Sequence, residues 1–253
     1  MNNKEFKGNL DSLPASLFID KNKKSDDYEN FFLVLGVVFN DLKGLMMFDM
    51  LIKESYRKPE EGEVSSHTGE YGGARIQINK FLIGVINEFL EFLKSNEGTM
   101  KTLEFQLLLK NLSPEHRKRW TDLVDVAMKK NTSDSEILKT LVNIRNNVAF
   151  HYYQSGKVLR KGFIDVFNNQ KDDKPQYKKP YFSVGETMES TRFYYSDASV
   201  EAYTRSVLTK EQVESISNIV DDMNSTITAL MTAYITSLKN KIKVNNKPKK
   251  KKR

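Results

Sequence analysis

The segment spanning residues 144–153 contains an arginine, Arg145, and a histidine, His151, six positions apart. A polar residue, Asn146, directly follows the arginine. A guanidinium group stays charged and offers paired donors to phosphate. An imidazole titrates near neutral pH and can give or take a proton. Together these residue types are suited to binding an anion and moving a proton.

The position of Arg145 on its expected helix is unusual. At about 100° per residue, Arg145 falls inside a broad apolar arc, and Asn146 and His151 lie at its two rims. The arc is made of Ile137, Leu138, Leu141, Val142, Ile144, Val148 and Ala149. Placing a charge on a buried face is costly unless it is paired or used. The pattern therefore predicts either an interior arginine satisfied by hydrogen bonds or a functional site at a helix–helix or subunit seam.

These residues resemble the signature of the HEPN superfamily (higher eukaryotes and prokaryotes nucleotide-binding domain). That signature is an Arg and a His separated by four to six residues, usually with a polar residue directly after the Arg. Here the separation is five residues and the polar residue is Asn146. A His-x-Tyr extension, seen in HEPN toxins paired with nucleotidyltransferase antitoxins, is matched by His151 and Tyr153. The resemblance covers about ten residues firmly.

The resemblance implies a metal-independent endoribonuclease with an all-α fold. Arg145 would bind the scissile phosphate, His151 would transfer a proton, and Asn146 would orient one of them or the substrate. Tyr153 is a candidate for modification by a partner nucleotidyltransferase, and Asn147 for modification or substrate contact. The family's sites usually form where two motif helices meet in a homodimer. RNA is the implied substrate, in toxin–antitoxin, stress or antiviral (phage) defence biology.

Two alternatives remain open at this point. One is a non-catalytic HEPN-like module that binds RNA or nucleotides or mediates dimerisation. The other is a helical structural or interaction protein in which the motif match is accidental. A monomer with Arg145 in an intramolecular salt bridge and His151 in solvent would favour this second alternative.

The composition predicts a soluble cytoplasmic protein with no membrane association. The 253 residues include no cysteine, which excludes disulfides, thiolate metal sites and a cysteine nucleophile. No apolar run approaches the length of a membrane span, and residues 1–10 have no signal-peptide core. The sequence predicts neither a cofactor nor a metal site. The remaining histidines, His67 in an expected loop and His116 at a helix start, lack a second ligand at metal spacing.

The net charge of +7 comes from the end of the sequence. Residues 239–253 hold nine of the 40 basic residues and no acid, which leaves 31 basic against 33 acidic residues elsewhere. The folded body is therefore near −2. We expect residues 244–253 to form a disordered basic tail that either attracts nucleic acid or has no specific role.

The expected domain is a bundle of long antiparallel helices over residues 25–243, after an irregular segment at 1–24. Helices are predicted at 28–56, with a break near Gly44, and at 74–95, 102–109, 114–130, 134–153 and 210–243. Ser113 with Pro114, Ser133 with Glu136, and Thr209 with Gln212 are the expected helix starts. Residues 57–73 are an expected loop, and Gly72 with Gly73 either form its flexible end or bind an anion at the next helix.

The segment at about 170–203 differs from the rest, because its apolar residues are aromatic or β-branched. It is predicted to be an insertion, with a short β-hairpin formed by strands near residues 181–184 and 191–195. Two roles stay open for its aromatic side chains. They either stack on bases or build a small satellite core.

Overall fold

The structure is a computed structural model that describes residues 10–19, 27–57, 60, 65–149, 152–167 and 179–245. The side chains of residues 149, 152–155 and 242–245 lie outside this description. The described chain is helical, which confirms the all-α prediction. Its elements are α1 (Ala15–Phe18), α2 (Asp27–Ser55), α3 (Ser66–Ser95), α4 (Glu97–Lys101), α5 (Leu103–Lys110), α6 (Pro114–Ala127), α7 (Thr132–Ile144), the π-helical turn η1 (Arg145–Ala149), α8 (Tyr152–Phe167), α9 (Tyr194–Val207) and α10 (Lys210–Asn245).

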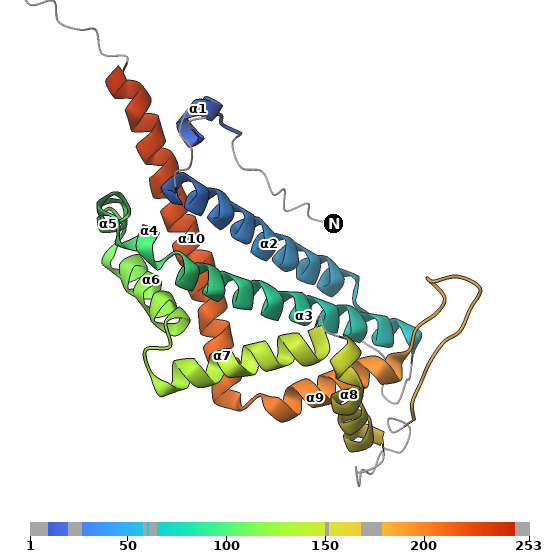
Figure 1. The fold of residues 1–253 in the computed structure, drawn as a ribbon. Helices are drawn as coiled ribbons and strands as arrows, with labels where there is room; N and C mark the ends of the chain where they lie inside the picture. Colours follow the sequence, from blue (N-terminus) through green and yellow to red (C-terminus); the bar gives the residue numbers. More distant parts are fainter. Residues whose placement is uncertain are drawn as a thin grey trace, which may run out of the picture.

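The long helices α2 and α3 lie side by side and antiparallel, and α10 packs against α2 and α6 (Figure 1). Helix α3 also contacts α6, α7, η1 and α9. Helices α8 and α9 pack closely against each other at the end of the molecule where α3 begins (Figure 1). Helix α3 is therefore the element that links the bundle to the motif turn and to the α8–α9 pair.

An aromatic cluster fills the core at the other end of α3. Phe32 of α2 stacks on Tyr234 of α10 with ring centroids 4.1 Å apart. Phe31 contacts Phe105 at 5.4 Å, and Phe105 contacts the only tryptophan, Trp120, at 5.8 Å. Aromatic rings carry large buried areas, so this cluster joins α2, α5, α6 and α10 into one core.

Two predicted helix starts are confirmed. The Ser113 side chain accepts a hydrogen bond from the backbone of His116, with Pro114 in the first turn of α6. At the start of α10, the backbone N–H of Thr209 donates to the Gln212 side chain at 3.1 Å, and the backbone N–H of Gln212 donates to the Thr209 hydroxyl at 3.2 Å. These reciprocal bonds satisfy amide groups that a helix start leaves unpaired.

Other predicted boundaries are wrong. Helix α7 is capped by Asn131, which accepts from the backbone of Asp134 at 2.8 Å, instead of by Ser133. Helix α2 continues through Gly44 without a break. Helix α3 begins at Ser66, so His67, Gly72 and Gly73 are helical residues and not part of a loop.

Close tertiary contacts explain why two positions of α3 are glycine. A Cβ atom on Gly69 would lie 2.4 Å from the Tyr194 ring, and one on Gly73 would lie 1.7 Å from the Arg192 guanidinium. Arg192 also pairs with Asp197 at 2.8 Å and Glu70 at 3.1 Å. The glycines thus provide the surface on which residues 192–197 dock against α3.

The predicted motif helix 134–153 is interrupted. Helix α7 ends at Ile144, and η1 continues the chain in π-helical geometry. Residues 150 and 151 lie outside the description, and α8 then runs on to Phe167, well past the predicted end. The π turn changes the direction of the side chains that follow Ile144.

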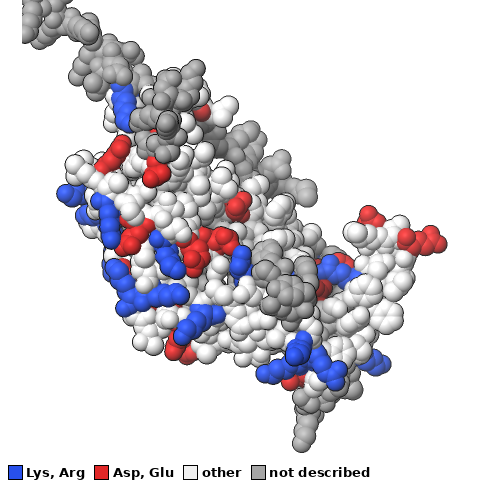
Figure 2. Space-filling view, in the orientation of Figure 1, with Lys and Arg blue, Asp and Glu red and all other residues white. Residues whose placement is uncertain are grey.

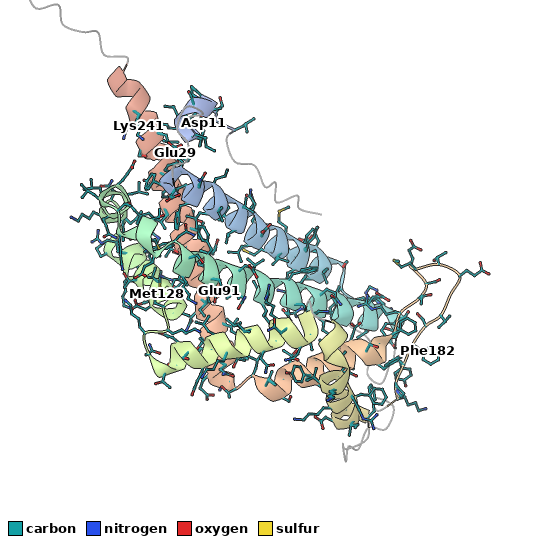
Figure 3. All side chains as sticks on the ribbon, in the orientation of Figure 1. Asp11, Glu29, Glu91, Met128, Phe182 and Lys241 are labelled. Atoms are coloured by element: carbon teal, nitrogen blue, oxygen red, sulfur yellow. The ribbon has the colours of Figure 1, made fainter. Side chains whose placement is uncertain are left out.

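The predicted β-hairpin is not formed in the described part of the insertion. One isolated antiparallel bridge joins Ser183 and Arg192, and the second predicted strand leads directly into α9. Ser199 and Tyr203 are buried one helical turn apart, which fixes this segment as a helix. Phe182, labelled in Figure 3, projects from the loop and is exposed, whereas Tyr195 contacts Phe163 of α8.

The two ends of the predicted domain differ only slightly from expectation. Within the N-terminal segment, α1 forms and Leu13 and Phe18 pack against the core. Asp11 forms an ion pair with Lys239 of α10. Asp11 and Lys241, which lies two residues after Lys239 in α10, are labelled in Figure 3. Helix α10 reaches Asn245, and residues 246–253 of the predicted tail lie outside the description.

Helix α2 is long and apolar enough to cross a membrane by length and composition alone. The sequence-based statement that no apolar run reaches this length is therefore wrong by that criterion. Core helices that are mostly buried pass the same test, but only 22% of the apolar stretch of α2 is buried, with Phe31, Phe32 and Leu35 among its buried residues. Cytoplasmic residence stays a prediction.

Two glycines in α8 allow a test of how closely α8 packs against α9. A Cβ on Gly162 would lie 2.2 Å from the Ser199 carbonyl oxygen of α9, whereas one on Gly156 meets nothing within 4 Å. We expect Gly162→Ala to lower the free energy of unfolding by about 1–3 kcal/mol, because α8 and α9 must separate. Gly156→Ala should raise it by up to about 1 kcal/mol through helix propensity. Urea denaturation of both variants checks this, and equal effects would contradict the close approach.

Candidate functional site

Arg145 is the first residue of η1 and lies against α3. Its Nη2 atom is 2.7 Å from Oε1 of Glu88. The arginine side chain is 32% exposed and that of Glu88 is 65% exposed. Its position on a regular helix predicted that Arg145 would be buried. In the structure the side chain instead reaches the surface beside an acidic partner.

The guanidinium group lines a surface cavity of about 330 Å³ between α2, α3 and η1. The lining residues are Val38, Asp41, Phe81, Gly84, Val85, Glu88 and Arg145. Its charge consists of one cation and two carboxylates, and the remaining walls are apolar. The cavity can thus hold a small anionic group only where that group displaces Glu88 from Arg145.

The structure separates the two asparagines from this cavity. Asn147 donates a hydrogen bond to the Asn143 carbonyl oxygen at 2.9 Å and a second one to its side chain. Asn143 in turn accepts from the Tyr203 hydroxyl of α9 at 3.3 Å. Asn147 therefore belongs to a contact with α9, and neither it nor Asn146 lines the Arg145 cavity.

The other two predicted site residues are only partly placed. Tyr153 lies in the first turn of α8, but its side chain is outside the description. His151 lies outside the described residues.

The two described histidines take part in local hydrogen bonds. His116 Nδ1 and the Ser113 hydroxyl are 2.8 Å apart, and His67 Nε2 accepts from the backbone of Arg57 at 3.2 Å. Within the described residues, no group of three or more His, Asp or Glu side chains is arranged to hold a metal ion.

Charges on the visible face are mixed. Figure 2 shows basic and acidic side chains interspersed on this face and not gathered into one basic surface. Exposed i,i+4 pairs such as Lys118–Asp122 and Lys101–Glu97 are examples of this pattern. An extended polyanion therefore gains little long-range attraction from this face.

Comparison of the chain with protein-family models, with curated proteins and with solved structures finds no match. The resemblance to the HEPN superfamily accordingly rests on the residues of the motif alone.

The Arg145–Glu88 ion pair is intramolecular, which is one of the features expected of a helical structural or interaction protein with an accidental motif match. Nothing in the sequence singles out Glu88, because an acidic residue on the polar side of an amphipathic helix is ordinary. Its role is visible only once α3 and η1 are in contact. The pair is exposed at its acidic end, which separates it from a buried structural salt bridge.

The strength of this pair distinguishes a structural clamp from an exchangeable contact. We expect a double-mutant cycle of Glu88→Gln and Arg145→Gln to give a coupling energy of about 0.2–1 kcal/mol, as for other solvent-exposed pairs. Urea unfolding of the two single variants and the double variant measures it. A coupling above about 2 kcal/mol would mean that Arg145 holds the fold and is not free to bind a ligand.

Proposed function

We propose that this chain is a HEPN-like, metal-independent endoribonuclease that acts as a homodimer. The observation that carries the proposal is the place of Arg145. It lies in a surface cavity, at a π-helical turn, and its partner Glu88 is largely exposed. π-helical turns occur often at functional sites. A phosphodiester carries the same single negative charge as the Glu88 carboxylate and can accept two parallel hydrogen bonds from arginine, so it can compete with Glu88 for the guanidinium.

The proposed reaction uses the groups of the motif in separate roles. His151 takes the proton of the ribose 2′-OH, whose oxygen attacks the adjacent phosphorus. The new bond to the 2′-oxygen forms as the bond to the 5′-oxygen of the next nucleotide breaks, and that oxygen takes a proton from water as it leaves. Arg145 stabilises the charge that builds on the phosphoryl oxygens. Asn146 orients His151 or the substrate in this scheme.

Exposed apolar side chains around the Arg145 cavity support the proposed dimer. Phe81 lines the cavity and is 51% exposed. Helix α2 contributes Val38 and Asp41 to the cavity and leaves Val34 and Phe48 exposed elsewhere along its length. An apolar surface beside an exposed charge is a suitable subunit interface, and two-fold symmetry would place both Arg145 side chains near the axis.

The second candidate function is a non-catalytic module that binds RNA or nucleotides. The observation in its favour is the same ion pair, together with Asp41 and Glu88 beside Arg145. These carboxylates oppose the negative charge that develops in phosphoryl transfer. Saturable RNA binding without turnover by the purified protein would select this candidate.

The first experiment is cleavage of total cellular RNA in excess EDTA by the wild type, His151→Ala and Arg145→Ala. Loss of a proton-transfer group should reduce the rate by about 10²–10⁴-fold. His116→Ala and Arg119→Ala are the matched controls, since Arg119 is 36% exposed and ion-paired as Arg145 is. Both controls should cleave at the wild-type rate. Equal cleavage by all variants would point to a contaminating nuclease, and cleavage by none would leave the binding module.

The dimer is tested separately from catalysis. We expect Phe81→Glu to convert the homodimer into a monomer, because a carboxylate would be buried in the interface. Leu107→Glu on α5 is the control, since Leu107 is equally exposed at 51% but lies away from the cavity. Light scattering after size-exclusion chromatography measures the mass of each. A monomeric wild type would contradict the proposed dimer.

A further inference from the structure

Helix α9 contacts the chain both before and after the motif turn η1. Before the turn, the Tyr203 hydroxyl of α9 donates a hydrogen bond of 3.3 Å to Oδ1 of Asn143, in the last turn of α7. After the turn, α8 packs against α9, and Gly162 of α8 lies so close to the backbone of Ser199 and Tyr203 that an added Cβ atom would meet both (Figure 1). Helix α9 therefore holds the two flanks of the segment that contains Arg145.

The Tyr203 side chain is a fixed donor. It is 6% exposed and belongs to the hydrophobic core. Helix α9 is itself attached to α3, because Asp197 in its first turn pairs with Arg192 at 2.8 Å and Arg192 also pairs with Glu70 of α3 at 3.1 Å. A buried side chain on an anchored helix keeps few rotamers, so the position of the hydroxyl is well defined.

Asn143 connects Tyr203 to the motif turn. The amide nitrogen of Asn147 in η1 donates to the backbone carbonyl oxygen of Asn143 at 2.9 Å and also to Asn143 Oδ1. A backbone carbonyl can only accept, which fixes the orientation of the Asn147 amide. The Asn143 atom that faces Asn147 and Tyr203 is then its carbonyl oxygen, and this single acceptor joins α9 to the turn.

The hydrogen bond from Asn147 lies where the backbone geometry changes. Helix α7 ends at Ile144 and the π-helical turn follows from Arg145 to Ala149. In an α-helix the carbonyl of residue 143 would accept from the backbone of residue 147, whereas π-helical bonds reach one residue further. The Asn147 side chain donates to this carbonyl, and side-chain bonds of this kind are a known cause of local changes in helix geometry. The network therefore stabilises the turn at whose first position Arg145 stands.

The turn is thus held on two sides by contacts of different character. On the α3 side, Arg145 pairs with Glu88, which is 65% exposed and contributes little to stability. On the α9 side, the contact comes from a buried tyrosine, and none of its three residues lines the Arg145 cavity. A ligand that displaces Glu88 from Arg145 would leave the α9 contact in place.

We propose that Tyr203, acting through Asn143 and Asn147, is a positioning residue for Arg145. It holds the π-helical turn, and so keeps the guanidinium group directed at its cavity when a ligand replaces Glu88. The consequence for catalysis rests on the proposed nuclease, whereas the contact with the turn does not.

Two tyrosines of α9 form a matched pair for testing the contact. The Tyr194 hydroxyl also donates a hydrogen bond of 3.3 Å, but to Glu70 of α3. Tyr203→Phe leaves Asn143 Oδ1 bonded to Asn147, so no acceptor is left without a partner. We expect the backbone amides of residues 143–149 to exchange hydrogen about two- to tenfold faster in Tyr203→Phe, and at the wild-type rate in Tyr194→Phe.

Hydrogen exchange followed by mass spectrometry measures this difference. The increase should be confined to residues 143–149 and absent from peptides of α2 and α6, since a general loss of stability would raise exchange throughout the core. Exchange in Tyr203→Phe that equals the wild type, or that rises equally in all helices, would overturn the proposal.

The two asparagines provide a second matched pair. Asn143→Asp keeps an oxygen acceptor for both Tyr203 and Asn147, whereas Asn147→Asp replaces the donor by an acceptor that faces a carbonyl oxygen. Both substitutions add one negative charge, one turn apart. We expect wild-type exchange at residues 143–149 in Asn143→Asp and faster exchange in Asn147→Asp. Equal exchange in the two variants would contradict the proposed role of Asn143 as the shared acceptor.

RNA cleavage shows whether the contact serves Arg145. Tyr203→Phe should lower kcat about ten- to a hundredfold with KM nearly unchanged, because Arg145 acts in the transition state, and Tyr194→Phe should cleave as the wild type does. A positioning residue loses its effect when the group that it positions is absent. Tyr203→Phe should therefore not reduce the residual cleavage by Arg145→Ala any further, whereas a reduction by the same factor in both backgrounds would overturn the proposal.

Failure of this inference and failure of the proposed nuclease give different results. A wild type that cleaves no RNA would remove the nuclease, and the exchange measurements would still decide whether Tyr203 holds the turn. A wild type that cleaves RNA, with exchange and kcat unchanged in Tyr203→Phe, would overturn the positioning role and leave the nuclease in place.

Discussion

The packing of α3 between α2 on one side and α6, α7 and α9 on the other is the constraint on which the rest of the structure depends. Its C-terminal half is fixed in the core by Phe89, Leu90 and Leu93, none more than 1% exposed. Close-packed interiors do not deform continuously, so the two sides of α3 are held at a set distance and orientation. One side presents Glu88 to the motif turn, and the other presents Arg75 and Lys80 to α9.

Arg145 stands at the change from α7 to the π turn η1. In a regular α-helix each residue turns by about 100°, which would place Arg145 among apolar side chains. In the structure Ile144 and Val148 are buried, whereas Val142, which belonged to the predicted apolar arc, is 38% exposed. The buried face is therefore narrower than the sequence pattern indicates, and the Arg145 side chain, 32% exposed, reaches the surface beside Glu88.

The sequence was sufficient for some features determined by neighbouring residues, although the α7 cap predicted at Ser133 lies at Asn131 and the break predicted at Gly44 is absent from α2. The caps at Ser113 and at Thr209 with Gln212 depend on side chains three residues apart, and both were predicted correctly. Features that depend on distant residues were not. Gly69 and Gly73 suggested a loop, but in the fold they make room for Tyr194 and Arg192. Tyr194 and Tyr195 suggested a strand, whereas the burial of Ser199 and Tyr203 follows a helical period. The pairing of Arg145 with Glu88 joins residues 57 positions apart, and no local pattern contains it.

The distribution of charge across α3 bears on how a polyanion would meet this surface. The body of the chain is near −2, and the Arg145 cavity has two carboxylates for its single cation. Long-range attraction therefore does not lead an anion to Arg145, and a ligand must gain its free energy from short-range contacts there. In the proposed function, a phosphodiester would compete with Glu88 for the guanidinium at equal charge. The exposure of Glu88 keeps the contribution of the ion pair to stability small, so the energy required to displace the carboxylate would be low.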